Sequence, residues 1–330
     1  MEIITTEPKV NGSYADTSIN NTVSNSKAFI TANTIESTLD EIKRKHVIPV
    51  FVKDNEPVIS HADLIESTMD VVQDIFHGET ILKPAVRLSH EIKGRIPEAK
   101  DKPAKALLEH EKTLYYERCA FIIIEVPSIR DEIAGNNLTL TIGGVKSYNL
   151  DNLYSRKGSD EHFKIFIGFK NTVCCNMCVW SDGYVGDLKV KNLEQLVACM
   201  RTLFVNYSAT SQLQALRKLT GYSLTEQQFA QLIGRCRMYN YLPNASKKDI
   251  TPLLLGDTQL TSVVKDYYRG DSFCRSDDGN INLWRLYNLF TSSNKTSYID
   301  TFADRTVNAF QFVDELRDAL DNKVSNWFLN

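Results

Sequence analysis

The chain has 330 residues, a formal net charge of −3 and 42% hydrophobic residues. Its length exceeds what one core usually supports, so we expect two sub-domains, and its composition excludes wholesale disorder. The near balance of charges gives no global case for nucleic-acid binding. The longest unbroken apolar run, residues 120–124, is far shorter than the roughly 20 residues that cross a bilayer, so no membrane span is expected.

Residues 1–28 are predicted to form a flexible tail. Residues 11–26 include ten Asn, Ser or Thr, so little burial offsets the entropy of ordering them. The N-terminal region also lacks the cationic start and apolar block of a secretory signal. The seven cysteines are an odd number without framework spacing, which fits reduced thiols. We therefore expect a cytoplasmic protein.

Two helices are expected before the sheet. In "NTIESTLDEIKRKH", Asn33 can cap a helix, Glu36 can reach back to it, and apolar residues recur at helical spacing. Residues 47–60 contain two prolines, which predicts a short strand, a turn and a second extended piece. Ser60 is then expected to cap a helix that ends at Gly78.

From Glu79 to about Asn192 the hydrophobic pattern has period two, which predicts a central antiparallel sheet. The expected strands include "TILKPAVRLSHEI", "RCAFIIIEV", "NLTLTIGGV", "HFKIFIGFK" and "TVCCNMCVW". "SDGYVGDLKVKN" is expected to be the second arm of a hairpin through Asp182 and Gly183. The later residues show apolar stripes at helical spacing.

The predicted fold class is therefore α+β, with a central antiparallel sheet and flanking helices. Residues 29–192 are expected to form the domain that contains the sheet. Residues 193–330 are expected to form a mostly helical sub-domain packed on it.

The stretch "CCNMC" contains one C-x-x-C pair, Cys175 and Cys178. A zinc site needs four ligands, and neither the other cysteines nor the six histidines stand at a suitable spacing. Residues three apart in a strand point to opposite faces, so these thiols should diverge. We favour buried strand residues over a redox thiol or a metal centre, and we predict no metal site and no cofactor.

Residues 83–105 contain seven basic residues against three acidic ones. Arg87, Lys93 and Arg95 are candidates to bind nucleic-acid phosphates, with tyrosines such as Tyr148 as stacking surfaces. The alternative, which we favour slightly, is that these are the ordinary charges of an edge strand, which protect a sheet from aggregation.

His90 and Glu91 are candidates for an acid/base pair, with or without a divalent metal. Neighbours in a strand face opposite sides, which counts against this pair, and Ile92 is expected to face the core. Near the C-terminus, Asn288 and Arg305 are polar exceptions on apolar helical stripes. Such an asparagine can bind a ligand or satisfy a buried backbone group.

Three stretches, "HVIPVFVKDNEPVISHADLIE", "VRLSHEIKGRIPEA" and "IGFKNTVCCNMCVWSDGY", carry a family resemblance. The chain after about Ala28 resembles domain-of-unknown-function family 3871, found in Bacteroides-type bacteria and their integrated mobile elements. This resemblance implies a setting in which nucleic-acid handling or interference with host defence is common, and it implies no reaction.

The segments "NTVCCNM" and "LWRLYNLFTSS" are similar, more distantly, to two motifs of the plasmid- and phage-borne domain-of-unknown-function family 932. Cys174 and Asn176 match the first motif, while two other positions depart from it. Trp284 and Asn288 match the second motif, which lies on a helix. This resemblance adds Asn176 to the candidate nucleic-acid contacts.

The function that we predict is a non-enzymatic binding protein of mobile elements, whose partner is DNA, RNA or a host protein. The alternative is a metal-dependent hydrolase or nuclease that uses His90 and a carboxylate. Common catalytic motifs are absent from the sequence, which favours binding. The sequence does not determine the oligomeric state, and an oligomeric structural component stays open.

Overall fold

The structure is a computed structural model that describes residues 28–32, 34–45, 59–99, 101–116, 118–152, 160–172, 174–270 and 272–330. The expected tail and the expected extended segment at 47–60 lie outside these ranges, apart from their last residues.

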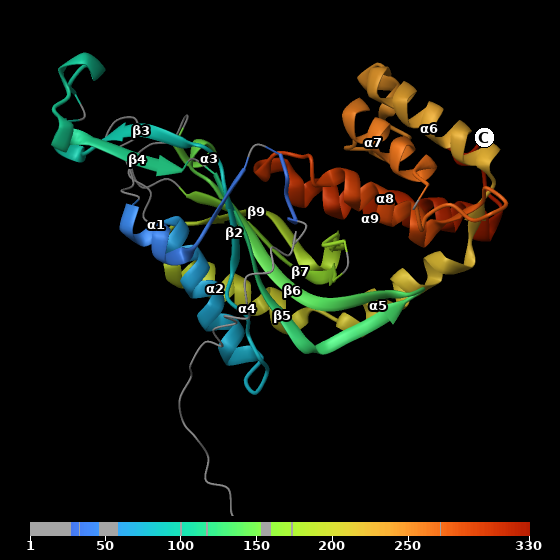
Figure 1. The fold of residues 1–330 in the computed structure, drawn as a ribbon, viewed down its shortest axis with the longest axis horizontal. Coiled ribbons are helices and arrows are strands. Elements are labelled where there is room, and N and C mark those ends of the chain that lie inside the picture. The colour runs from blue at the N-terminus through green and yellow to red at the C-terminus, as the bar shows by residue number, and fades with distance from the viewer. Residues whose placement is uncertain are drawn as a thin grey trace, which may run out of the picture.

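The centre of the fold is a seven-stranded sheet in which neighbouring strands run antiparallel (Figure 1). The strands in order are β1 (Ile35–Ser37), β2 (Ala85–Leu88), β5 (Arg118–Ile133), β6 (Asn136–Ser147) and β7 (Glu161–Asn171), followed by β8 (Met177–Cys178) and β9 (Tyr184–Val190), which both pair with β7. The α+β class and the antiparallel sheet expected from the sequence are therefore confirmed.

Helices cover both faces of this sheet. On one face lie α2 (His61–Ile75), α4 (Leu193–Asn206) and α5 (Ala209–Lys218), whose apolar residues join the larger of two core clusters (Figure 1). On the other face, the start of α9 (Ile299–Asn322) packs Phe302 near Val145 and Phe166 in the smaller cluster. The strand alternation seen in the sequence thus separates two buried faces.

The C-terminal part is mainly helical. It contains α6 (Glu226–Tyr241), α7 (Asp257–Tyr268), α8 (Leu283–Asn294) and α9, with short 3-10 helices at Leu219–Gly221 and Asn244–Lys247 and a small sheet of β10 (Ser223–Leu224) and β11 (Ile281–Asn282). The larger core cluster includes residues of both the sheet and these helices. The division into sub-domains at residues 29–192 and 193–330 stays a prediction. In the described ranges, no helix combines the length and the apolar character that a membrane crossing requires.

A ribbon projects from one side of the molecule (Figure 1). It consists of β3 (Glu91–Arg95) and β4 (Lys112–Tyr116), which pair with each other, and of 3-10 turns at Pro97–Ala99, Ala104–Ala106 and Glu109–Glu111. We call residues 91–116 the arm.

The expected first helix is partly wrong. Ile35–Ser37 form the edge strand β1, and α1 (Leu39–Lys45) begins only after them. The Thr38 hydroxyl accepts from the Glu41 backbone N–H at 3.2 Å, and the Glu41 carboxylate accepts from the Thr38 N–H at 3.3 Å. This capping box fixes the start of the helix later than Asn33. The cap expected at Ser60 is confirmed.

The cysteine-rich segment is a turn rather than a continuous strand, which corrects two expectations. Cys175 has φ 56°, a left-handed conformation that interrupts the pleat, and its N–H bonds to the Asn171 carbonyl at 2.8 Å. Among the described residues of this segment, the two residues of β8 are the ones that pair with β7. After a 3-10 turn at Ser181–Gly183, β9 also pairs with β7, so the expected hairpin between β8 and β9 is absent.

Candidate functional site

A cavity of about 600 Å³ lies where two strand turns meet α8. Its walls come from the β5–β6 turn, the turn before β8, one side of α8 with Lys295 after it, and the end of α7 with the segment that follows. This volume lies within the range of ligand sites. We call it the asparagine cavity, after the three asparagines that line it, Asn136, Asn176 and Asn288.

Side-chain amides tie the turns to α8. The Asn171 Nδ2 donates to Asn136 Oδ1 at 2.7 Å and to Asn288 Oδ1 at 3.5 Å. The Asn176 Nδ2 donates to the Asn288 carbonyl at 3.0 Å. Asn176 and Asn288, predicted separately from the sequence, are thereby in contact although they lie 112 positions apart. The Asn288 Nδ2 in turn donates to the Trp284 carbonyl at 2.9 Å.

One amide oxygen of this network has no partner. Asn176 is 2% exposed, and its Oδ1 is buried without a hydrogen bond to any described residue. A buried acceptor without a donor costs about 1–3 kcal/mol. A ligand or a water that donates to this oxygen would therefore be stabilising.

The charged residues described in the walls of the cavity are mostly cationic. Among the described lining residues, Arg269, Arg285 and Lys295 stand with one acid, Asp266. Arg285 Nη1 donates to the Ser276 hydroxyl at 3.0 Å, and Lys295 Nζ donates to the Cys174 carbonyl. Arg269 pairs with the acid, at 3.5 Å between Nη1 and Asp266 Oδ1. The excess of positive charge favours an anionic ligand.

An aromatic ring stands among these lining residues. The Phe273 side chain is 48% exposed, an unusual position for a large apolar ring. Aromatic rings near cationic side chains are the surfaces on which nucleobases stack.

No disulfide joins the two thiols that line the cavity. Cys174 and Cys274 line the cavity, and all seven cysteines are free. Burial raises the pKa of Cys274 to about 12 and also raises the pKa of Cys178. Within the described ranges, no three His, Cys, Asp or Glu side chains gather in a way that would hold a metal ion.

The predicted basic residues lie on different elements of the fold. Arg87 lies on β2, where its Nε donates to the Thr34 hydroxyl and its Nη2 to the Thr34 carbonyl, each at 3.0 Å. Lys93 and Arg95 lie on the arm in a separate sheet, and Arg95 donates to the Lys102 carbonyl. Asn176 lies in the asparagine cavity. The structure thus gives Arg87 a structural role in holding the chain before β1 onto β2.

The remaining candidate residues from the sequence also lie on different parts of the fold. His90 and Glu91 are exposed at the base of the arm, and Ile92, expected in the core, is 36% exposed because the arm leaves the main sheet. Tyr148, expected as a stacking surface, is buried and stacks on His61. Arg305 lies on α9, where its Nη1 donates to the Ser297 hydroxyl at 2.7 Å and burial lowers its pKa.

Sequence reasoning missed a buried ion cluster. The Lys146 Nζ, fully buried, lies 2.8 Å from Asp151 Oδ2 and 2.7 Å from Glu161 Oε2. Asp151 belongs to the short helix α3 (Tyr148–Asn152), and its other oxygen accepts from the His162 N–H at 2.7 Å. The only signal in the sequence was a lysine inside an apolar strand. This cluster joins β6, α3 and β7.

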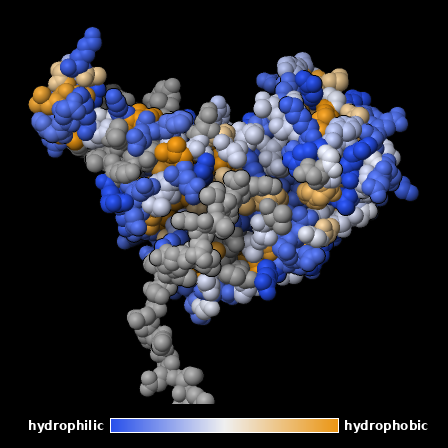
Figure 2. Space-filling view, in the orientation of Figure 1, coloured by the Kyte–Doolittle hydropathy of each residue, from blue (hydrophilic) through white to orange (hydrophobic). Residues whose placement is uncertain are grey.

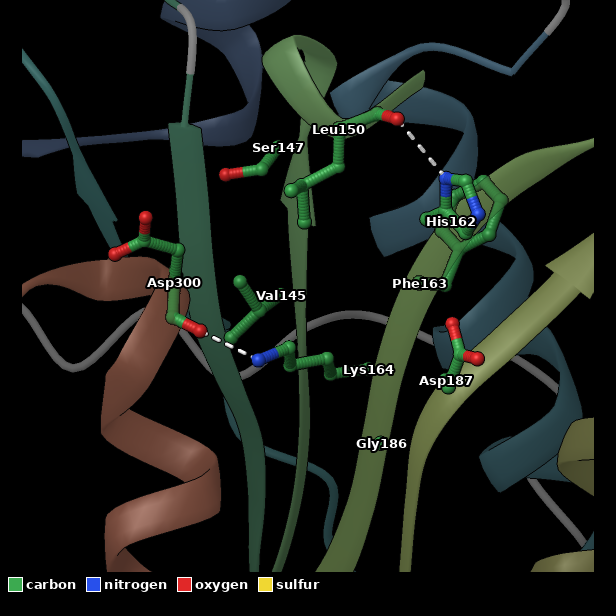
Figure 3. Close-up of a pocket in the computed structure, with 9 residues that line it drawn as sticks. All are labelled: Val145, Ser147, Leu150, His162, Phe163, Lys164, Gly186, Asp187 and Asp300. Carbon is green, nitrogen blue, oxygen red and sulfur yellow. Dashed lines mark hydrogen bonds between the residues drawn. The ribbon is translucent and has the colours of Figure 1, made fainter. Parts of the chain in front are cut away.

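A second, smaller cavity lies beside this cluster (Figure 3). It measures about 170 Å³ and its apolar lining includes Leu150 and Phe163. Two of its polar side chains are engaged by backbone carbonyls: His162 Nδ1 lies 3.1 Å from the Leu150 carbonyl, and Lys164 Nζ donates to the Asp300 carbonyl at 2.5 Å. Because it is smaller than ordinary ligand sites and its cation is engaged, the asparagine cavity is the stronger candidate.

One family model matches residues 16–329, nearly the whole chain. The family is described as "Domain of unknown function, B. Theta Gene description (DUF3871)". No curated protein and no solved structure matches the chain.

Proposed function

We propose that this chain, which belongs to that family of unknown function, is a non-enzymatic binding protein. Its asparagine cavity takes a phosphate-bearing ligand, either a nucleotide or the end of a nucleic-acid strand. The observation that carries the proposal is the convergence of Arg269, Arg285 and Lys295 on one cavity, where Asp266 is the one acid among the described lining residues.

Each part of the cavity suits a part of such a ligand. Arginines present a planar fork that matches phosphate oxygens, and lysines bind phosphate as point charges. Asparagine amides donate and accept hydrogen bonds at the edges of bases. The exposed ring of Phe273 offers a stacking surface.

The enzymatic alternative has less support. His90 and Glu91, on which a hydrolase or nuclease would depend, do not line the asparagine cavity, and they follow each other at the base of the arm. The binding function therefore stands as the single proposal.

The proposed setting is a cytoplasm, in a protein carried by mobile elements. The seven free cysteines support a reducing compartment, since secreted proteins usually pair their thiols. The mobile-element setting rests on the sequence resemblance alone.

Binding is tested by fluorescence anisotropy with short labelled single-stranded DNA and RNA, in competition with ATP and with inorganic phosphate. Arg285→Gln is expected to raise the dissociation constant about ten-fold, because it removes a charge-assisted contact worth ~1.4 kcal/mol. Competition by ATP would identify a nucleotide, and competition by unlabelled strands alone would identify a nucleic acid.

The matched control is Lys93→Gln, which removes a charge on the arm and should leave the dissociation constant unchanged. Thermal unfolding of both variants checks that the fold is intact. The proposal is overturned if no probe binds at about 100 μM protein, the weak limit of ordinary non-specific binding. Equal losses in both variants would also contradict it.

A further inference from the structure

The arm is a ribbon of two strands that pair with no third strand among the described residues. In the part of the chain that the structure describes, β3 pairs with β4 alone. A two-stranded ribbon without further partners is only marginally stable in water, and an open edge is a template for pairing with another chain.

The arm also contributes nothing to the two hydrophobic clusters. None of its described side chains belongs to either cluster. Ile92 is 36% exposed and Leu108 is 54% exposed, and Figure 2 shows hydrophobic residues on the surface of the projecting arm. Exposed apolar residues on a projecting element are typical of an interaction surface.

Two residues of opposite charge share one face of β3. Glu91 and Lys93 are two positions apart, so they point to the same side of the ribbon, and both are exposed. Ile92 lies between them and points to the opposite side.

We propose that β3 pairs antiparallel with β3 of a second copy of this chain, about a two-fold axis that passes through Ile92. In this register Glu91 of each copy faces Lys93 of the other, and the two Ile92 residues face each other. The pairing joins two arms into a four-stranded sheet and makes an isologous dimer. It goes beyond the proposed function and does not depend on the ligand.

The charges select this register over its neighbours. An axis through Lys93 would oppose two lysines, and an axis through Glu91 would oppose two carboxylates. Like charges directly opposite each other in a sheet are destabilising, whereas opposite charges stabilise the pair. An axis through Lys93 would also set Glu91 of each copy opposite Arg95 of the other, but it keeps the pair of lysines. Along β3, only the axis through Ile92 gives two favourable pairs without a like-charged pair.

The test is sedimentation equilibrium of the full chain. The wild-type protein is expected to dimerise, and Lys93→Glu or Glu91→Lys alone is expected to raise the dimer dissociation constant about ten-fold, because each places two like-charged pairs in the interface. The double variant Glu91→Lys with Lys93→Glu restores both pairs and should return the constant to within about three-fold of the wild type.

The matched control is Lys105→Glu, a charge reversal at another exposed position of the arm, which should leave the dimer intact. Circular dichroism checks the fold of each variant. A wild-type chain that stays monomeric at about 100 μM overturns the proposal, since a micromolar dimer would be formed there. A double variant that is no better than either single variant also overturns it, because the register would then be wrong.

Discussion

The cysteines show how position, more than spacing, decides the chemistry of a side chain. Cys119, Cys178 and Cys236 are buried, and burial raises the pKa of each thiol because the thiolate loses its solvation. Cys174 and Cys175, which are sequence neighbours of Cys178, lie partly exposed in the turn. The C-x-x-C spacing alone did not distinguish these environments.

We expect a short pulse of N-ethylmaleimide at pH 8 to label Cys174, Cys175 and Cys199 first, because these three are partly exposed. The other four cysteines should react slowly, since their raised pKa values keep them protonated at this pH and their burial excludes the reagent. Mass spectrometry of peptides measures the order of labelling. Urea should abolish the difference, whereas early labelling of Cys178 in the native protein would contradict the assignment.

At the scale of elements, strand β6 needs a glycine at the position that lies opposite an aromatic residue of β7. Gly143 pairs with Phe166 of β7, and a Cβ at Gly143 would lie 2.5 Å from the Phe166 ring and 2.4 Å from the Phe121 carbonyl oxygen. Such distances are shorter than real contacts, so the phenylalanine ring occupies the space that a side chain would need.

Gly143→Ala is therefore expected to destabilise the protein by about 3 kcal/mol. Gly234 is the matched control: it lies exposed in α6 with no atom near its missing Cβ, so Gly234→Ala should stabilise the helix by about 0.5–1 kcal/mol. Urea unfolding followed by circular dichroism gives both values. Similar free energies for the two variants would show that the close contact in β6 does not constrain the sheet.

At the scale of the whole molecule, the arm and the asparagine cavity are separate features. Lys93 and Glu91 lie on the ribbon of β3 and β4, whereas Arg285 and Asn288 lie on α8 (Figure 1). Residues without shared partners usually contribute additively to the free energies that they affect. Dimerisation and ligand binding should therefore respond to different substitutions.

We expect Arg285→Gln to weaken ligand binding without changing the dimer, and Lys93→Glu to weaken the dimer without changing ligand binding. In the double variant, the loss in free energy of ligand binding and the loss in free energy of dimerisation should each equal the loss in the corresponding single variant, within about 0.5 kcal/mol. Anisotropy and sedimentation on the same samples measure the two quantities. If Lys93→Glu alone weakened oligonucleotide binding, the arm would belong to the nucleic-acid surface, as the basic segment of the sequence first suggested.

The sequence by itself determined the α+β class, the antiparallel sheet, the helical C-terminal part and the cap at Ser60. These features follow from periodicity and capping, which are local and act over a few residues. It also singled out Asn176 and Asn288 individually, through resemblance and through a polar exception on an apolar stripe.

Only the tertiary structure decided which of these residues meet. The contact between Asn176 and Asn288, the cations around them and the pairing of Lys146 with Asp151 and Glu161 depend on the path of the chain. The same holds for β1, which becomes a strand because β2 offers it an edge, although its pattern favours a helix. Side-chain contacts between distant segments are set by packing. The hydrophobic pattern of one segment does not specify which other segment packs against it.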